Sequence, residues 1–427
     1  MLVEKLMYNK EILPNGLRIV TSEMPHTRSI SMAIFIGTGS RYEPDEEAGL
    51  SHFLEHLLFK GTDRRPTAKD ISEAIEGVGG ILNAATDKEL TVYSCKVAKP
   101  HFPLGLDVLV DMIRHPLMAT EEVEKERKVV IEELHMIQDD PRDWVDVLID
   151  QVMWPSQPLG RDVAGREETV NSFTRDAALS YLARQYAPAN TVISVAGDLT
   201  HDAIVEQVAG AMGDWTGGPP TPFFPAEDSQ SSPRLEISER PTEQAHLCLA
   251  VPGLSSRHPD RFVLDLLNVI LGEGMSSRLF LEIREKQGLA YDVHSQITHY
   301  TDTGAAMVYA GVDPRRAEDT VRAILEQLQA FKEEKVAAVE MTKAKEFTKG
   351  RLFLRMEDTR SVVGWMGAQE LLLGRIMTVD EVVEIIEAVT PDDLHRIARS
   401  LYVPERLSLA LVGPLKDGDR FAQLLKL

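Results

Sequence analysis

Apolar residues recur along the chain with two different periods, which predict a mixture of strands and helices. Short runs of β-branched and aliphatic residues indicate strands, whereas apolar positions three and four residues apart indicate amphipathic helices, because such spacings place side chains on one face. In the first half, the predicted strands are residues 29–37 and 91–97. The predicted helices of that half are residues 50–59, 68–78, 101–113 and 121–138.

The second half of the chain repeats this mixture. Its predicted strands are residues 245–251 and 305–312. Its predicted helices are residues 261–271, 314–332 and 336–355. Strands followed by pairs of helices are typical of two-layer sandwiches. We therefore expect an α+β fold with one α/β sandwich domain in each half.

The two halves share a local motif at a constant offset of 216 residues. Residues 174–197 and 390–413 each read as a capped helix, a Tyr-x-Pro turn and an aliphatic strand that ends at glycine. The identical pairs are Thr174/Thr390, Asp176/Asp392, Tyr186/Tyr402, Pro188/Pro404 and Gly197/Gly413. Helix–turn–strand units can look alike by chance, but five identities without a gap favour an internal duplication.

A proline-rich segment, residues 217–233, divides the chain nearly in half. Its five prolines lack the amide donor that helices and sheets require. We interpret it as a linker between a first domain, residues 1–216, and a second domain, residues 234–427.

Composition narrows the classes of function. Hydrophobic residues make up 43% and charged residues 26% of the 427 positions, the profile of a soluble globular protein. The formal charge of −21 argues against nucleic acid as a partner, because phosphate contacts need clustered Lys and Arg. This charge either attracts cationic peptides or only maintains solubility. No apolar run approaches the roughly 18 residues of a membrane span, and the N-terminus lacks a secretory pattern, so we expect a cytoplasmic protein.

Candidate chemistry begins with residues 49–62, GLSHFLEHLLFKGT. In a helix, His52 and His56 lie four residues apart on one face with Glu55 beside them. Two such imidazoles can bind one zinc ion, and the neighbouring carboxylate can take a proton from water. Cys95 and Cys248 are the only cysteines, too few for a cysteine-based site. The alternative is a half-buried helix with an ordinary histidine pair.

A third protein ligand is expected at a catalytic zinc. Residues 120–140 form a predicted acidic helix in which Glu126 and Glu133 lie seven residues apart on one face. Taken alone, this segment reads as a solvated acidic helix.

The combination resembles the pitrilysin/insulinase family of zinc metallopeptidases, in its bacterial processing-peptidase-like branch. An H-x-x-E-H motif is followed, after 76 intervening residues, by a Glu within E-x-x-x-V-x-x-E. The resemblance covers the whole chain, and it implies one Zn²⁺ per chain on His52, His56 and Glu133, with Glu55 as catalytic base. It also implies that Glu126 is not a ligand itself but contacts the metal ligands and orients them. Residues 79–84, GGILNA, are similar to the family's substrate-binding edge strand. This similarity implies that Asn83 and Ala84 bind substrate.

The second half carries a different signature, residues 278–291, RLFLEIREKQGLAY. Arg284 and Tyr291 match an Arg/Tyr pair that holds the substrate backbone in the family. Such donors can bind a carbonyl or the oxyanion that develops from it. The same residues also read as an ordinary helix end, with Gly288 as its cap, followed by a strand.

The second half has no H-x-x-E-H motif, so the resemblance implies a catalytic first domain and a homologous inactive second domain. We expect a zinc-dependent endopeptidase that hydrolyses short or unfolded polypeptides in a closed chamber. A homodimer arranged as a clamshell is the expected assembly. The alternatives are a subunit of a heterodimeric presequence-processing peptidase and a non-catalytic structural subunit of the same fold.

Overall fold

Each half of the chain contributes one β-sheet in this computed structural model, which describes residues 8–426. The contacts divide these residues into two units. Unit 1 holds the residues up to Leu134 together with Asp162–Phe224 and Phe353–Asp380. Unit 2 holds His135–Arg161, Pro225–Leu352 and the residues from Glu381 onward.

The sheet of unit 1 has six strands in the order β1-β2-β6-β3-β5-β4. Its strands are β1 (Asn9–Ile12), β2 (Arg18–Glu23), β3 (Ser29–Ile36), β4 (Ile81–Thr86), β5 (Thr91–Ala98) and β6 (Thr191–Gly197). Only β2 and β6 pair in parallel, and the other neighbours are antiparallel.

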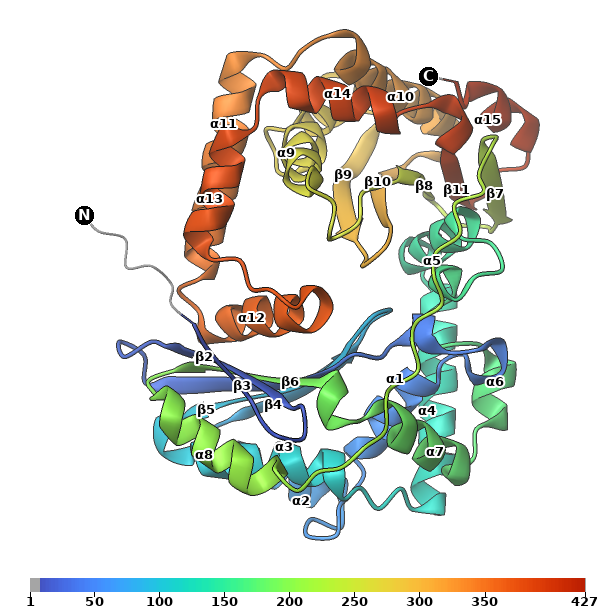
Figure 1. Cartoon of the computed structure of the whole chain (residues 1–427). Helices are drawn as coiled ribbons and strands as arrows, with labels where there is room; N and C mark the ends of the chain where they lie inside the picture. The colour runs from blue at the N-terminus through green and yellow to red at the C-terminus, as the bar shows by residue number, and fades with distance from the viewer. Residues whose placement is uncertain (1–7, 427) are drawn as a thin grey trace. The chain divides into compact units, whose positions relative to one another are not determined.

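Helices cover both faces of this sheet. They are α1 (Leu50–Leu58), α2 (Ala68–Glu76), α3 (Phe102–Arg114), α4 (Thr120–Asp139), α6 (Glu167–Ser172), α7 (Arg175–Gln185), α8 (His201–Met212) and α12 (Thr359–Leu373). Helix α12 lies against β3 and β6 on one face, whereas α2, α3 and α8 lie on the other (Figure 1). The apolar residues of α1, including Phe53, Leu54 and Leu57, are fully buried in the core on this second face.

The sheet of unit 2 has five strands in the order β7-β11-β8-β10-β9. Its strands are β7 (Arg234–Glu239), β8 (Ala245–Pro252), β9 (Ala290–His299), β10 (Gly304–Val312) and β11 (Ser408–Gly413). The helices are α5 (Pro141–Met153), α9 (Arg261–Gly272), α10 (Ala317–Glu333), α11 (Ala338–Arg355), α13 (Val379–Ala388), α14 (Pro391–Leu401) and α15 (Gly418–Leu424), with a π-helix, η6 (Phe280–Lys286). Helices α4, α11 and α13 each cross a limit between the units.

The two sheets repeat one topology. In both, a parallel pair is followed by three antiparallel neighbours, and β1 is the only addition in unit 1. Strands β2 and β7, and likewise β3 and β8, begin and end 216 residues apart, the offset of the sequence motif. The predicted α+β fold with two related sandwich domains is confirmed.

Two helices are exchanged between the halves of the sequence. Helix α5 comes from the first half but packs on β8 and β11, and α12 comes from the second half but packs on β3 and β6. The units therefore differ in these segments from the predicted domains 1–216 and 234–427. Hydrophobic periodicity shows that a helix has an apolar face, but it does not show which sheet that face covers. Within the described chain, residues 217–233 contain no helix or strand.

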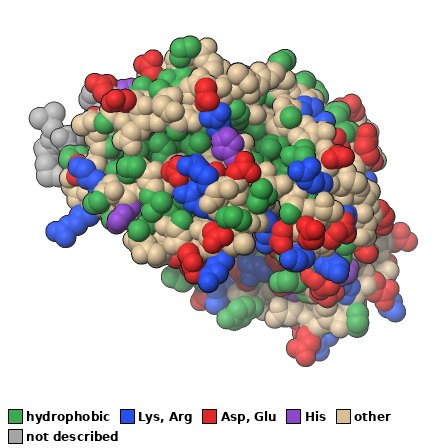
Figure 2. Space-filling model, turned by 90° about the horizontal axis from the view of Figure 1, so that it is seen from below, with side chains coloured by type: hydrophobic (Ala, Val, Ile, Leu, Met, Phe, Trp, Pro, Cys, Tyr) green, Lys and Arg blue, Asp and Glu red, His purple; other side chains and the backbone are tan. Residues whose placement is uncertain are grey.

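On the face shown in Figure 2, acidic and basic side chains are intermixed and gather mainly at the lower right of the view. Among residues 8–426, no helix combines the length and the hydrophobicity needed to cross a bilayer.

Candidate metal centre

The position of α1 is fixed by an acidic cap at its N-terminus. The buried carboxylate of Glu43 accepts hydrogen bonds from the backbone amides of Gly49, at 2.7 Å, and Ser51, at 2.6 Å. A negative charge there complements the unpaired amides and the dipole of the helix. Gly49 has φ +96°, and a Cβ atom on it would lie 2.3 Å from the carbonyl oxygen of Ala164. The chain therefore needs glycine where α1 begins.

Helix α1 turns its apolar side into the core and leaves its polar side half-exposed. Leu50, Phe53, Leu54, Leu57 and Leu58 are buried. His52, Glu55 and His56 share the remaining face, and the two imidazole rings lie 4.7 Å apart. The helical period therefore places both histidines and the glutamate on one surface.

Helix α4 brings Glu133 to this surface. Its Oε2 lies 3.7 Å from Nε2 of His52 and 3.4 Å from Nε2 of His56. In the described part of the chain, these residues form the only group of three or more His, Cys, Asp or Glu residues whose ligand atoms all lie within 4.8 Å of one another. Two imidazoles and one carboxylate are a donor set of catalytic zinc sites. Donors of a tetrahedral zinc with bonds of about 2.0–2.1 Å lie roughly 3.4 Å apart, so the residues fit the ion.

Glu126 lies behind His56. Its Oε2 is 3.1 Å from Nδ1 of His56, and its Oε1 accepts an ion-paired hydrogen bond from Lys60 at 2.7 Å. Burial acts to raise the pKa of Glu126, but the hydrogen bonds from His56 and Lys60 outweigh it and lower the pKa. A carboxylate in this place fixes the ring, so that Nε2 of His56 faces Glu133.

The pKa values of the two histidines are shifted in opposite directions. Burial, with a contribution from His56, lowers the pKa of His52 to about 4, so His52 is neutral as a metal ligand must be. Its Nδ1 is buried and has no hydrogen-bond partner among the described residues. Burial also acts to lower the pKa of His56, but Glu126, Glu133 and Glu55 outweigh it and raise the pKa.

Glu55 lies beside the three potential ligands without being one of them. Thr86 donates a hydrogen bond of 2.5 Å from its hydroxyl to Oε2 of Glu55. Burial raises the pKa of Glu55; Thr86 and His56 oppose this, and Glu133 adds to it. A partly buried carboxylate with a raised pKa is suited to accept and return a proton near neutral pH.

The predicted substrate residues Asn83 and Ala84 lie on β4, the last strand of the sheet. Strand β4 pairs with β5, and no other described strand lies on its outer side. Side chains alternate between exposed and half-buried along it, with Asn83 exposed. An edge of this kind offers main-chain groups for pairing with an extended peptide.

Arg284 and Tyr291 lie together in unit 2. Arg284 belongs to η6, and its guanidinium is 5.3 Å from the ring of Tyr291 and 4.8 Å from that of Phe280. Tyr291, on β9, is 77% exposed, so its hydroxyl is available to a ligand. Gly288 has φ +59° just after η6, as expected of a helix end.

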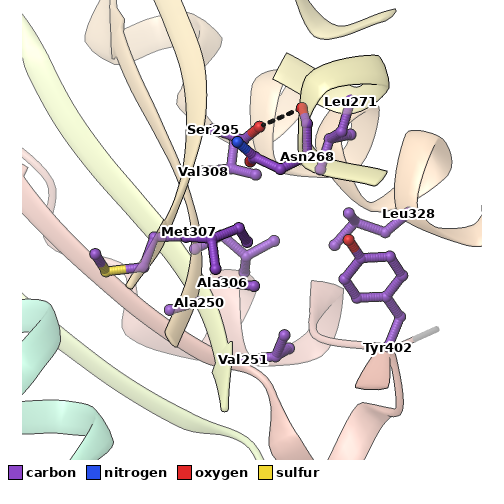
Figure 3. Close-up of a pocket in the computed structure, with 12 residues that line it drawn as sticks. Ala250, Val251, Asn268, Leu271, Ser295, Ala306, Met307, Val308, Leu328 and Tyr402 are labelled. Carbon is purple, nitrogen blue, oxygen red and sulfur yellow. Dashed lines mark hydrogen bonds between the residues drawn. The ribbon is translucent and has the colours of Figure 1, made fainter. Parts of the chain in front are cut away.

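Helix α9 of unit 2 has no comparable donor set. Its buried positions follow those of α1 at an offset of 213 residues. Asp265, Asn268 and Val269 then stand where α1 has His52, Glu55 and His56. Figure 3 shows Asn268 beside Ser295 at a cavity of about 10 Å³, which has room for about one water molecule. This cavity is too small for a peptide.

Sequence reasoning missed two residues of the site, Glu43 and Thr86. An acidic residue shortly before a helix is a usable signal for a cap, so Glu43 could have been found. Thr86 had no signal, because its contact with Glu55 depends on how β4 packs beside α1.

Comparison with known proteins identifies related peptidases. The family model described as insulinase (peptidase family M16) matches residues 18–167, and the model described as the peptidase M16 inactive domain matches residues 172–347. An uncharacterized zinc protease of Streptomyces coelicolor is 40% identical over 95% of this chain and 89% of its own length. Another, of Bacillus subtilis, is 38% identical over 96% of this chain and 98% of its own length.

Solved structures share the fold at lower identity. A protease from Helicobacter pylori superposes with a TM-score of 0.90 at 22% identity, covering 95% of this chain and 99% of its own. Complex III2 from Candida albicans includes a chain with a TM-score of 0.84 at 18% identity, covering 98% of this chain and 100% of its own. The family models span most of both sheets, and the relatives align over nearly the full length. The chain therefore belongs to the insulinase family, peptidase family M16.

Proposed function

We propose that the protein is a zinc-dependent endopeptidase that binds one zinc ion per chain through His52, His56 and Glu133. The observation that carries the proposal is the convergence of these donors from α1 and α4, with Glu55 beside them. The zinc proteases among its relatives support the same metal and reaction.

In this proposal, each protein group around the metal has a separate role. Zinc held by these residues would act as a Lewis acid, polarising the peptide carbonyl and lowering the pKa of water. Glu55 takes the proton from the attacking water and returns it to the leaving amine. Glu126 holds the ring of His56 in place. Arg284 and Tyr291 donate hydrogen bonds to the carbonyl oxygen as its negative charge grows.

The substrates are short or unfolded polypeptides in an extended conformation. Asn83 and Ala84 lie on an edge strand, where a peptide can pair through its main chain. Main-chain pairing depends little on side chains, so broad specificity follows. Arg284 and Tyr291 can take part in the reaction only in a closed chamber. This chamber forms within one chain or across a homodimer, and homodimers are the commonest oligomers.

Two alternatives share the fold. One is a heterodimeric presequence-processing peptidase, and the other is a structural subunit, as the similarity to a chain of complex III2 allows. A structural subunit has no need of a zinc donor set, so the cluster of His52, His56 and Glu133 favours a peptidase.

Digestion of a peptide library, read by mass spectrometry, tests this function. Cleavage should stop after chelation and return when zinc is added to the chelated protein. His52→Ala protein should bind less zinc and cleave no peptide, whereas the exposed control His26→Ala should behave like the wild type. Cleavage that persists in the chelated protein at the wild-type rate would exclude a zinc mechanism.

A further inference from the structure

Thr86 connects the strand proposed to bind substrate with the group proposed as the base. We propose that Thr86 is a positioning residue: its hydroxyl holds the carboxylate of Glu55 and ties the base to edge strand β4. This inference rests on the proposed peptidase function.

The hydrogen bond joins two elements that are separately fixed. Thr86 is the last residue of β4 and is held in register opposite Thr91 of β5. Glu55 lies on α1, whose apolar face is buried in the core. Thr86 Oγ1 lies 2.5 Å from Oε2 of Glu55. Because a β-branched side chain has few χ1 rotamers, the strand sets the direction of the hydroxyl.

Thr86 is the donor that reaches this carboxylate. Among residues 8–426, Thr86 makes the one hydrogen bond to the carboxylate of Glu55. It engages Oε2, so Oε1 is left to accept a proton. A glutamate side chain has three rotatable bonds, and a single strong contact at its end restricts them. Without Thr86, the carboxylate would sample orientations that do not reach the reacting water.

The same strand carries the residues proposed to pair with substrate. Asn83 and Ala84 precede Thr86 on β4, and Ala84 and Thr86 lie on the same side of the strand because side chains alternate. This side faces the core that α1 helps to form. A peptide that pairs with the outer edge of β4 therefore orders the strand whose last residue holds the base. Loss of the hydroxyl should reduce kcat more than it changes KM.

Two substitutions separate the hydroxyl from the shape of the side chain. Thr86→Val keeps the branched shape and removes the donor, and we expect kcat to fall roughly 10- to 100-fold with KM within about twofold. Thr86→Ser keeps the donor and should recover most of kcat, and Thr86→Ala should behave like Thr86→Val. Thr21→Val is the matched control. Thr21 lies in the same sheet as Thr86, and its hydroxyl forms a hydrogen bond of 2.8 Å with His201.

The NMR signal of the Glu55 carboxylate provides a measurement that is independent of activity. In metal-free protein with ¹³C-labelled glutamate, the side-chain carboxyl resonance of Glu55 is assigned by its loss in Glu55→Gln. That resonance should move in Thr86→Val and stay near its wild-type position in Thr86→Ser and Thr21→Val. Zinc content and melting temperature should match the wild type in all threonine variants.

The outcomes distinguish this inference from the proposed function. If the wild type shows no zinc-dependent cleavage, both proposals are wrong. If the wild type cleaves peptides and Thr86→Val does so at the same kcat, only the role of Thr86 is wrong. An unmoved Glu55 resonance in Thr86→Val also contradicts it. Equal loss of kcat in Thr86→Ser and Thr86→Val would show that shape, and not the hydroxyl, matters.

Discussion

At the scale of single residues, opposing charges around His56 define the chemistry of the site. His56 lies within 3.4 Å of Glu133 and 3.1 Å of Glu126, and Glu126 is itself buried and paired with Lys60. His56 therefore has one carboxylate at each ring nitrogen, Glu126 at Nδ1 and Glu133 at Nε2. A carboxylate behind a histidine is a usual support for a metal ligand, so this arrangement fits the proposed zinc site.

Replacement of Glu126 tests whether this carboxylate supports the metal. Glu126→Ala removes the partner of Nδ1 in His56, so zinc affinity should fall roughly 10- to 100-fold. Competition with a chelator of known affinity measures the change. Glu132→Ala is the control, because Glu132 is an exposed neighbour on the same helix. Equal affinity of the two variants would remove Glu126 from the metal centre.

The residues that the sequence could predict are those set by local spacing. His52, Glu55 and His56 share a face because the helical period places them there. Glu133 needed the family resemblance, because 76 residues separate it from His56. Thr86 was not predictable, since its hydrogen bond to Glu55 is a product of tertiary packing.

At the scale of elements, exchanged helix α12 is anchored by its own N-cap. Asp358 accepts a hydrogen bond from the amide of Ser361 at 2.9 Å and pairs with Lys96 of β5 at 2.9 Å. Ser31 of β3 and Thr359 of α12 share a buried hydrogen bond of 2.8 Å. These contacts attach a helix of the second half to the sheet of the first.

Loss of this cap should destabilise the protein without affecting the metal centre. Asp358→Ala should cost about 0.5–2 kcal/mol of the free energy of unfolding, measured by chemical denaturation, with zinc content unchanged. Asp417→Ala removes the equivalent N-cap of the short terminal helix α15, and its stability serves for comparison. A variant as stable as the wild type would show that Asp358 does not anchor α12.

The same cap predicts a pH dependence. Burial acts to raise the pKa of Asp358, but Lys96 and the amide of Ser361 outweigh it and lower the pKa. A carboxyl with a lowered pKa stabilises the fold above its unfolded value of about 3.9, and this contribution is lost as the pH falls through the folded pKa. The stability difference between the wild type and Asp358→Ala should therefore be full at pH 7 and shrink below about pH 4.

Whether a segment forms a helix or a strand was easier to predict than which sheet a helix packs against. The predicted strand 29–37 is β3 and the predicted helix 121–138 is α4, each within a residue or so at its ends. The exchange of α5 and α12 was not predictable, since an apolar helix face fits either sheet. The π-helical turns of η6 were also missed, because the sequence pattern does not distinguish them from α-helix.

At the scale of the whole molecule, the two units carry different parts of the proposed site. The metal donors lie in unit 1, whereas Arg284 and Tyr291 lie in unit 2. In the proposed function, one copy of the duplicated fold therefore holds the metal donors and the other holds the donors to substrate.

Tyr291→Phe tests whether the second unit takes part in the reaction. Loss of one hydrogen-bond donor to a developing oxyanion costs roughly 10²–10³ in rate, so kcat/KM should fall by about that factor. Zinc content and melting temperature should not change, because Tyr291 is 77% exposed. Tyr8→Phe is the control, because it loses a hydroxyl bonded to the carbonyl of Ile376. A loss of stability with normal kinetics would leave Tyr291 a purely structural role.

The most direct test of the zinc peptidase combines metal content and turnover on one sample of Glu55→Gln. The substitution leaves His52, His56 and Glu133 in place, so elemental analysis should find one zinc per chain, as in the wild type. The amide cannot accept the proton of water, so cleavage of the peptide library should fall by roughly 10²–10⁴. Wild-type cleavage by zinc-loaded Glu55→Gln would contradict the account.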